Sequence, residues 1–437
     1  MTVSPVPPEQ ETAPTSTTVP AAPTMPTGPT GPFATFATFE PQSARVPSQG
    51  GSPGIEADVA GAARPCVTEL RLAAFAGLRQ VSVPLGAVTV LAGASGSGKT
   101  RALRAYAALA RLGHGTEIGQ VFPDPLGCVP QRARPDAQRR RGFRIGCTAD
   151  GPEGPVRLDV AVQAEPELRI VGERLTSGGV VLLETALLDP SRRTVRATWY
   201  TGGASPVTRV PFPGDRLAAT LLPLRMAGRT DAERRVLAAA EQLVVALRSV
   251  FACDPRPGRM REPVPTGSGR LLGGCDNLAD VLWRTRAECA QRHGQLVAAL
   301  RAGCAGPVAD LYARALTDGT VRAVLDRGDG HRTDLARLGS GELRYLALAL
   351  VLLTGPGVLE VDAAGEVPDA MQTLTVLADG LDRCLDPRQR RELLLLAARM
   401  SRRGHVRVVG TVHDATWAAG VEGVSVVHLD PVVDLVP

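Results

Sequence analysis

The chain has 437 residues, of which 44% are apolar, 21% are charged and only 3% are aromatic. These values are typical of a globular chain of one to three domains, and the scarcity of aromatics argues against an aromatic platform for bases or sugars. The net charge of +5 permits contact with nucleic acid without requiring it, and no apolar run is long enough to predict a membrane-spanning helix.

The N-terminal region differs in composition from the rest of the chain. Residues 1–64 are rich in Pro, Thr and Ser and contain no leucine. Such a segment buries too little apolar surface to offset its conformational entropy, so we expect a disordered tail. It has no signal-peptide pattern, and the eight cysteines form no C-x-x-C pair, so we expect reduced thiols and a cytoplasmic protein.

Strands and helices alternate after the tail. Apolar patterns predict strands over 67–75, 80–83 and 88–92, and then a helix over 99–112. An arginine-rich connection follows, and short alternating segments up to residue 200 predict an antiparallel β insertion. They lie at 143–147, 156–162, 168–171, 180–183 and 195–200.

The second half begins with helical periodicity, over 215–253 and 276–325. An α/β alternation returns from residue 334, with a helix, a strand, further helices and two strands. These elements are predicted at 341–353, 358–361, up to 403, 406–411 and 423–429. The predicted organisation is an α/β unit over 65–437, with core lobes 65–131 and 334–437, a β insertion over 132–213 and a helical subdomain over 214–333.

The strongest local motif lies between the strand ending at Ala92 and the following helix. Residues 93–100 fit the pattern G-x-x-x-x-G-K-[ST], in which backbone N–H groups and a helix N-terminus surround phosphate oxygens. Lys99 is the only lysine beside 48 arginines, as expected where the ammonium group is irreplaceable. The predicted nucleotide-binding residues are Gly93, Ala94, Ser95, Gly96, Ser97, Gly98, Lys99 and Thr100, with Thr100 also a ligand of Mg²⁺.

Three downstream features accompany this motif. Ser340 and Gly341 open an apolar helix and offer a second anion site, although an ordinary N-cap explains them equally well. Asp362 ends the predicted strand at 358–361 and is predicted to hold Mg²⁺. His413 follows the predicted strand at 406–411, where it is predicted to sense the γ-phosphate.

In this order, the motifs resemble the ABC-type P-loop ATPase heads of the RecF, SMC and OLD-like group, including the predicted AAA-family ATPases of bacteria. The resemblance covers about residues 67–430 and is weak in the β insertion. It implies an α/β P-loop NTPase fold with an antiparallel β insertion and a helical arm. It also implies a homodimer in which Ser340 and Gly341 face ATP held by the other subunit, and a glutamine near the metal, for which Gln131 is the better candidate and Gln120 the other.

One departure from this group concerns hydrolysis. The resemblance implies an acidic residue directly after the metal carboxylate, but Ala363 follows Asp362. Glu366 is the candidate replacement, and Glu360 shares the strand face of Asp362. Two functions therefore stay open: an Mg²⁺-dependent ATPase that passes its dimerisation to a partner protein or DNA, and a nucleotide-gated binding module that does not hydrolyse ATP. A third and weaker possibility is the ATPase subunit of a membrane transporter. It is weaker because the predicted arm and the Leu-Gly-Ser-Gly-Glu sequence resemble the DNA-repair and defence branch more closely.

The connection after the first helix carries a basic run with a single interleaved aromatic residue. In a chain with 48 arginines, a solvated loop is favoured over a surface that follows a phosphate backbone, so DNA binding remains an open possibility. The run contains Arg132, Arg134, Arg139, Arg140, Arg141 and Arg144.

Overall fold

The computed structural model describes residues 42–43, 64–203, 209–267, 269–361, 367–368 and 371–429. The predicted tail thus lies outside the described residues, apart from Arg64 and the two-residue strand β1 (Gln42–Ser43). None of the helices within these ranges is long and apolar enough to cross a lipid bilayer.

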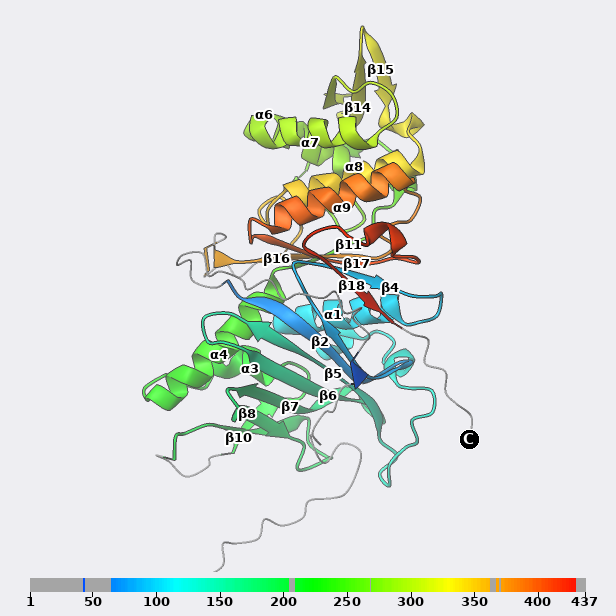
Figure 1. Ribbon diagram of the computed structural model, residues 1–437. Helices are drawn as coiled ribbons and strands as arrows, with labels where there is room; N and C mark the ends of the chain where they lie inside the picture. Colours follow the sequence, from blue (N-terminus) through cyan, green and yellow to red (C-terminus); the bar gives the residue numbers. More distant parts are fainter. Residues whose placement is uncertain are drawn as a thin grey trace, which may run out of the picture.

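The molecule is a stack of layers (Figure 1). A parallel sheet lies in the middle, with α8 (Ser340–Leu353) and α9 (Pro387–Ser401) on one face and α1 (Lys99–Gly113) on the other. Beyond α8 and α9 follow α6 (Leu278–Glu288), α7 (Ala290–Gly303) and a small antiparallel sheet. Beyond α1 lies a large antiparallel sheet, so α1 is enclosed between two sheets.

The parallel sheet gathers strands from distant parts of the sequence. Its order is β11-β16-β17-β4-β18, with every neighbouring pair parallel. Leu91 packs into the core that contains α1, whereas Val90 and Ala92 pack into the core that contains α8 and α9. Both faces are therefore covered, as parallel sheets require. The strands are β11 (Val250–Cys253), β16 (Leu374–Ala378), β17 (Val406–Thr411), β4 (Val88–Ala92) and β18 (Val424–His428).

The predicted β insertion is part of a larger sheet of nine strands, in the order β1-β3-β2-β5-β6-β7-β8-β9-β10. The strands predicted at 67–75 and 80–83 belong to this sheet and not to the parallel sheet of the strand at 88–92, because β2 pairs with β3 and β5. Apolar alternation predicts a strand but does not choose its partner. Besides β1, the strands are β2 (Cys66–Phe75), β3 (Leu78–Pro84), β5 (Arg141–Asp150), β6 (Val156–Glu165), β7 (Arg169–Ser177), β8 (Val180–Ala186), β9 (Thr194–Trp199) and β10 (Val210–Pro213).

Helix α4 (Asp231–Arg248) joins this sheet to α1. It begins after Thr230, whose hydroxyl accepts a hydrogen bond from the Glu233 N–H, and its buried face contacts α1, β2 and β5. Gly113 of α1 leaves no room for a Cβ atom beside Leu247 of α4. Short helical turns occupy the connections: α2 (Ile118–Val121), η1 (Leu126–Cys128), α3 (Ala218–Leu221), η2 (Leu222–Leu224), α5 (Pro257–Met260), η3 (Leu335–Arg337) and η5 (Thr416–Ala418).

The helical subdomain predicted over 214–333 is only partly helical. Its middle contains β11 of the parallel sheet, and the part after residue 309 forms an antiparallel sheet over α6. Alternation along 320–328 places every second side chain toward α6, which is the period of a strand and not of a helix. This small sheet contains β12 (Val264–Pro265), β13 (Asp310–Ala315), β14 (Thr320–Gly328) and β15 (His331–Asp334).

The prediction of a strand at 358–361 is also wrong. Only Leu359 makes a bridge, to Leu271, and the flanking backbone hydrogen bonds of Val358 and Glu360 also go to Leu271. The segment therefore pairs with the loop before α6 and is not a strand of the parallel sheet. The strand beside β17 is β16, in a region for which helices were predicted.

Candidate nucleotide site

The loop 93–100 connects β4 to α1 at the carboxyl edge of the parallel sheet. Gly93 and Gly98 have φ values of 149° and 95°, and a Cβ atom at either position would collide with Leu429 or Leu78. Only glycine fits such a close approach at a positive φ. The loop therefore has the backbone that the motif predicts, and it ends directly in a helix of 15 residues.

Lys99 is folded back on this loop. Its Nζ donates to the carbonyl oxygens of Gly93 at 2.6 Å and Ala94 at 2.8 Å, and lies 3.4 Å from the Ser97 hydroxyl. Two backbone carbonyl oxygens thus hold the ammonium group over the loop, and phosphate oxygens can take their place as its partners. Lys99 is the first residue of α1, so the start of this helix places its ammonium group beside the loop.

The carboxylate beside the loop is Asp379. It follows β16, and its Oδ1 and Oδ2 lie 3.0 and 3.2 Å from the Thr100 hydroxyl. The Thr411 hydroxyl at the end of β17 donates to Asp379 at 2.6 Å and accepts from the Gly380 N–H at 2.8 Å. Three neighbouring strands therefore bring two hydroxyl groups and one carboxylate together, a set of oxygen atoms suited to Mg²⁺.

Sequence reasoning missed Asp379 and chose Asp362. Asp362, Ala363 and Glu366 lie outside the described residues, and Glu360 is exposed on the segment that pairs with Leu271. Each aspartate follows a short apolar run, but all five residues of β16 are buried, whereas the other run contains a charged residue. A buried run without a charged residue is the usual pattern of a central parallel strand and is the signal that favours Asp379.

Gly380 directly follows Asp379 and provides no side chain. The next carboxylate on this loop is Asp382, whose Oδ2 accepts from the backbone N–H of His413 at 3.2 Å. His413 lies after β17, as predicted, and its side chain is exposed. The structure thus brings the backbone of His413 to the loop 379–382.

Ser340 and Gly341 begin α8, as predicted. Ser340 does not cap the helix with its side chain; its hydroxyl accepts from Arg261 at 3.3 Å, while the same guanidinium donates to the Leu338 carbonyl at 3.0 Å. A Cβ atom at Gly341 would collide with the carbonyl oxygen of Cys384. Among the described residues, no hydrogen bond joins Ser340 or Gly341 to the loop 93–100 of the same chain.

Arg344, one turn into α8, connects this helix to the aspartate loop. Its guanidinium is 2% exposed and donates to the carbonyl oxygens of Gly380 at 3.0 Å and Asp379 at 3.3 Å. It also donates to the Pro255 carbonyl at 2.7 Å and pairs with Asp254 at 3.1 Å. Sequence reasoning passed over this residue because a single arginine in an apolar helix has no distinguishing spacing.

Of the two candidate glutamines, Gln131 lies at the phosphate loop. It lines a hollow of about 210 Å³ together with Gly96, Ser97 and Gly98. Gln120 is exposed on α2 and does not line this hollow.

Comparison with solved structures gives matches to SMC head domains. A Smc head bound to the C-winged helix domain of ScpA has 12% identity and a TM-score of 0.42, over 83% of this chain and 96% of that chain. The SMC head domain from Thermotoga maritima has 13% identity and a TM-score of 0.37, over 83% and 98%. A Smc head with an extended coiled coil, bound to the C-terminal domain of ScpA and derived from Pyrococcus furiosus, has 12% identity and a TM-score of 0.39, over 83% and 96%.

No protein-family model matches the chain, and no curated protein matches it in sequence. At these identities and TM-scores we transfer no residue role from the solved structures.

Proposed function

We propose that this protein is a Mg²⁺-dependent ATP-binding head of the ABC/RecF-like type, whose main output is a change of assembly state and not rapid turnover. The observation that carries the proposal is the contact between Thr100 and Asp379 at the end of the phosphate loop. It joins the first turn of α1 to the carboxyl end of β16, so phosphate and metal ligands meet at one edge of the sheet.

The individual roles follow from position. Residues 93–100 would hold the phosphates, with Lys99 moving from the Gly93 and Ala94 carbonyls to the β- and γ-phosphates. Thr100 and Asp379 would hold Mg²⁺, with Gln131 at the near wall of the hollow. The metal would neutralise charge on the phosphate oxygens. Asp379 takes over the metal role that the sequence assigned to Asp362.

The proposal of slow hydrolysis rests on Gly380. A residue at this position follows the metal carboxylate directly, and glycine can neither orient water nor accept its proton. The other candidate function is an ordinary ATPase in which Asp382 or His413 orients the water; Asp382 accepts from the backbone N–H of His413 at 3.2 Å. Glu366 remains a further candidate from the sequence.

Nucleotide binding is tested by titrating ATP into the full chain with Mg²⁺ and with EDTA. Asp379→Asn should weaken Mg²⁺-ATP binding by about tenfold or more and leave binding in EDTA unchanged, because it removes one charged metal ligand. Asp276→Asn, which removes a carboxylate in an ion pair with Arg256, is the matched control. An equal Mg²⁺ effect in Asp379→Asn and wild type would remove Asp379 from the site.

Turnover is tested by steady-state hydrolysis with Lys99→Ala as the blank. We expect wild type close to the blank and a rate gain in Gly380→Glu but not in Gly380→Gln. Both substitutions place a side chain at φ 62° beside Arg383, so they share the same backbone strain and differ in the carboxylate. A fast wild-type rate that vanishes in Lys99→Ala would instead favour the ordinary ATPase.

The assembly we propose is a homodimer with ATP between the subunits. Ser340 and Gly341 lie at an α8 N-terminus that makes no hydrogen bond to its own phosphate loop within the described residues, so they are available to the nucleotide of a second copy. A partner protein would then respond to dimerisation. DNA and the membrane subunit of a transporter are alternatives to this partner protein. The transporter is the weaker of the two, and copurification with membrane proteins would favour it.

A further inference from the structure

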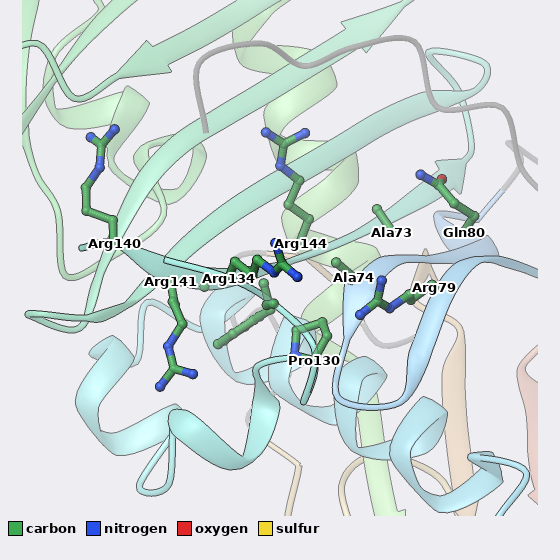
Figure 2. A pocket seen from close by; sticks show the side chains of 12 residues that line it. Ala73, Ala74, Arg79, Gln80, Pro130, Arg134, Arg140, Arg141 and Arg144 are labelled. Carbon is green, nitrogen blue, oxygen red and sulfur yellow. The ribbon is translucent and has the colours of Figure 1, made fainter. Parts of the chain in front are cut away.

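A second hollow, of about 360 Å³, lies beside the phosphate-loop hollow (Figure 2). Arg79 and Pro130 line both hollows. Among the residues that the structure describes, five arginines and no acidic residue line the second hollow, although the whole chain has nearly balanced charge. The arginines are Arg79, Arg134, Arg140, Arg141 and Arg144.

Two of these five arginines are neutralised by acids outside the hollow. Arg140 pairs with Asp136 at 2.8 Å, and Arg141 pairs with Glu165 at 2.5 Å. In Figure 2 their side chains, and that of Arg144, point away from Arg79 and Arg134. Arg140 and Arg141 therefore form the wall and contribute little net charge to the interior.

The other three arginines that line the hollow are Arg79, Arg134 and Arg144. Arg79 and Arg134 point toward one another above Pro130 in Figure 2, and within the described ranges neither side chain has an ion pair or hydrogen bond. Arg144 is half-buried, and this burial lowers the pKa of its guanidinium, with Asp159 the nearby carboxylate that opposes the effect. Arg79 and Arg134, two cations without a partner in the described ranges, repel one another unless an anion joins them.

One wall of the hollow is built on paired strands, whereas Pro130, Ala133 and Arg134 come from the connection before β5. Phe143 forms its floor and packs edge-on against Phe75 and Phe122, with ring centroids 5.5 and 4.9 Å apart. The β2–β5 pairing shifts register between Leu72 and Ala74, and Gln80 opposite has a φ of 52°, rare for a residue with a side chain. Such bulges redirect side chains near binding sites.

We propose that this hollow binds a small anion with two or more phosphate groups, next to the nucleotide and separate from it. The guanidinium groups of Arg79 and Arg134 match several phosphate oxygens, and a volume of about 360 Å³ limits the ligand to about the size of a nucleotide. A nucleic acid backbone would need cations spread along an extended path, whereas these two face one another across one hollow. The proposal is independent of ATP hydrolysis and of dimerisation.

The test uses tripolyphosphate as the probe and calorimetry on the full chain carrying Lys99→Ala, which weakens the phosphate loop. We expect one binding site per chain. Arg134→Asn in this background should weaken binding by about tenfold or more. Arg139→Asn makes the same substitution in the same connection, at a residue that does not line the hollow, and should leave binding unchanged.

The outcomes separate the possible sources of phosphate. Equal weakening by Arg134→Asn and Arg139→Asn would mean diffuse attraction to a basic surface and would overturn the proposal. Tighter binding of a short DNA duplex that excludes tripolyphosphate would make the hollow part of a nucleic-acid surface and would also overturn it. Residual binding at the phosphate loop does not depend on Arg134, so it does not imitate the expected result.

Discussion

Asp379 illustrates how a single side chain escapes prediction from sequence. The phosphate loop was predictable because all of its chemistry lies within eight consecutive residues and its glycines have one physical purpose. Asp379 meets Thr100 across 279 positions of sequence, through strands whose pairing is not local. Two aspartates follow short, largely apolar runs, and besides the charged Glu360 in one run the pairing of β16 with β17 distinguishes them.

Glu173 is a second residue whose role appears only in the fold. It is completely buried on β7, and its two carboxylate oxygens accept from the N–H groups of Ala218 at 2.6 Å and Ala219 at 2.9 Å, at the start of α3. Burial raises its pKa from 4.5 to about 7, although the two N–H groups oppose this shift. The folded protein therefore retains a proton between these pH values that the unfolded chain releases.

We predict a pH dependence of stability from this carboxyl group. Its contribution is fully present below pH 4.5 and is lost as the pH rises to 7, by roughly 3 kcal/mol at most. Urea unfolding of wild type and Glu173→Gln at several pH values measures it, since the difference between the two proteins cancels all other titrating groups. A difference in unfolding free energy that is constant with pH would contradict the prediction.

Helix α8 has two structural roles. Its apolar residues fill the core, and its first turns lie at the candidate site. All residues from Leu343 to Leu353 are buried, and Arg344 is the one charged residue among them. Its four acceptors come from the loops after β11 and β16. The helix start and the aspartate loop are thus held in one arrangement.

Arg344→Met tests this connection. Methionine keeps the apolar stem but leaves the buried Asp379, Gly380 and Pro255 carbonyls without this donor, so we expect a loss of about 2–3 kcal/mol in unfolding free energy. Mg²⁺-ATP affinity should fall as well, because Asp379 loses its fixed position. The exposed Arg337→Met is the control for both measurements. If folded Arg344→Met bound Mg²⁺-ATP as tightly as wild type, Arg344 would have no positioning role.

The elements themselves were predictable to different degrees. The helices α1, α8 and α9 and the strands β2, β3 and β5 to β9 have long or periodic patterns, and their prediction is confirmed. The strands β11 and β16 have four and five residues, too few to show a period, and they were included in helical regions. Strand β4 is equally short, but the glycine-rich loop directly after it made it predictable. Sheet membership failed for β2 and β3 because it depends on partners far along the chain.

The whole molecule places its candidate site where two cores meet. Alternate residues of β4 contribute to the core around α1 and to the core around α8 and α9. The phosphate loop follows directly after β4, and the start of α8 lies across the parallel sheet from α1 (Figure 1). A second copy that supplies its α8 start to this edge would complete the enclosure of a nucleotide.

Dimerisation is therefore predicted to depend on Ser340. Ser340→Glu puts a negative charge where the partner's phosphates would approach, so this variant should bind ATP normally yet stay monomeric. Ser191→Glu, in the exposed turn before β9, should dimerise like wild type. Light scattering with and without Mg²⁺-ATP measures the mass; equal dimerisation of both variants would exclude Ser340 from the interface.

The strand order also determines when the site can form during synthesis. β4 emerges early, but its two neighbours in the sheet are β17 and β18, which end at Thr411 and His428. The nascent chain therefore carries an apolar strand with both edges unpaired until more than 300 further residues have been added. ATP cannot stabilise this chain while it grows, so protection of β4 before release has to come from the α1 core or from a chaperone.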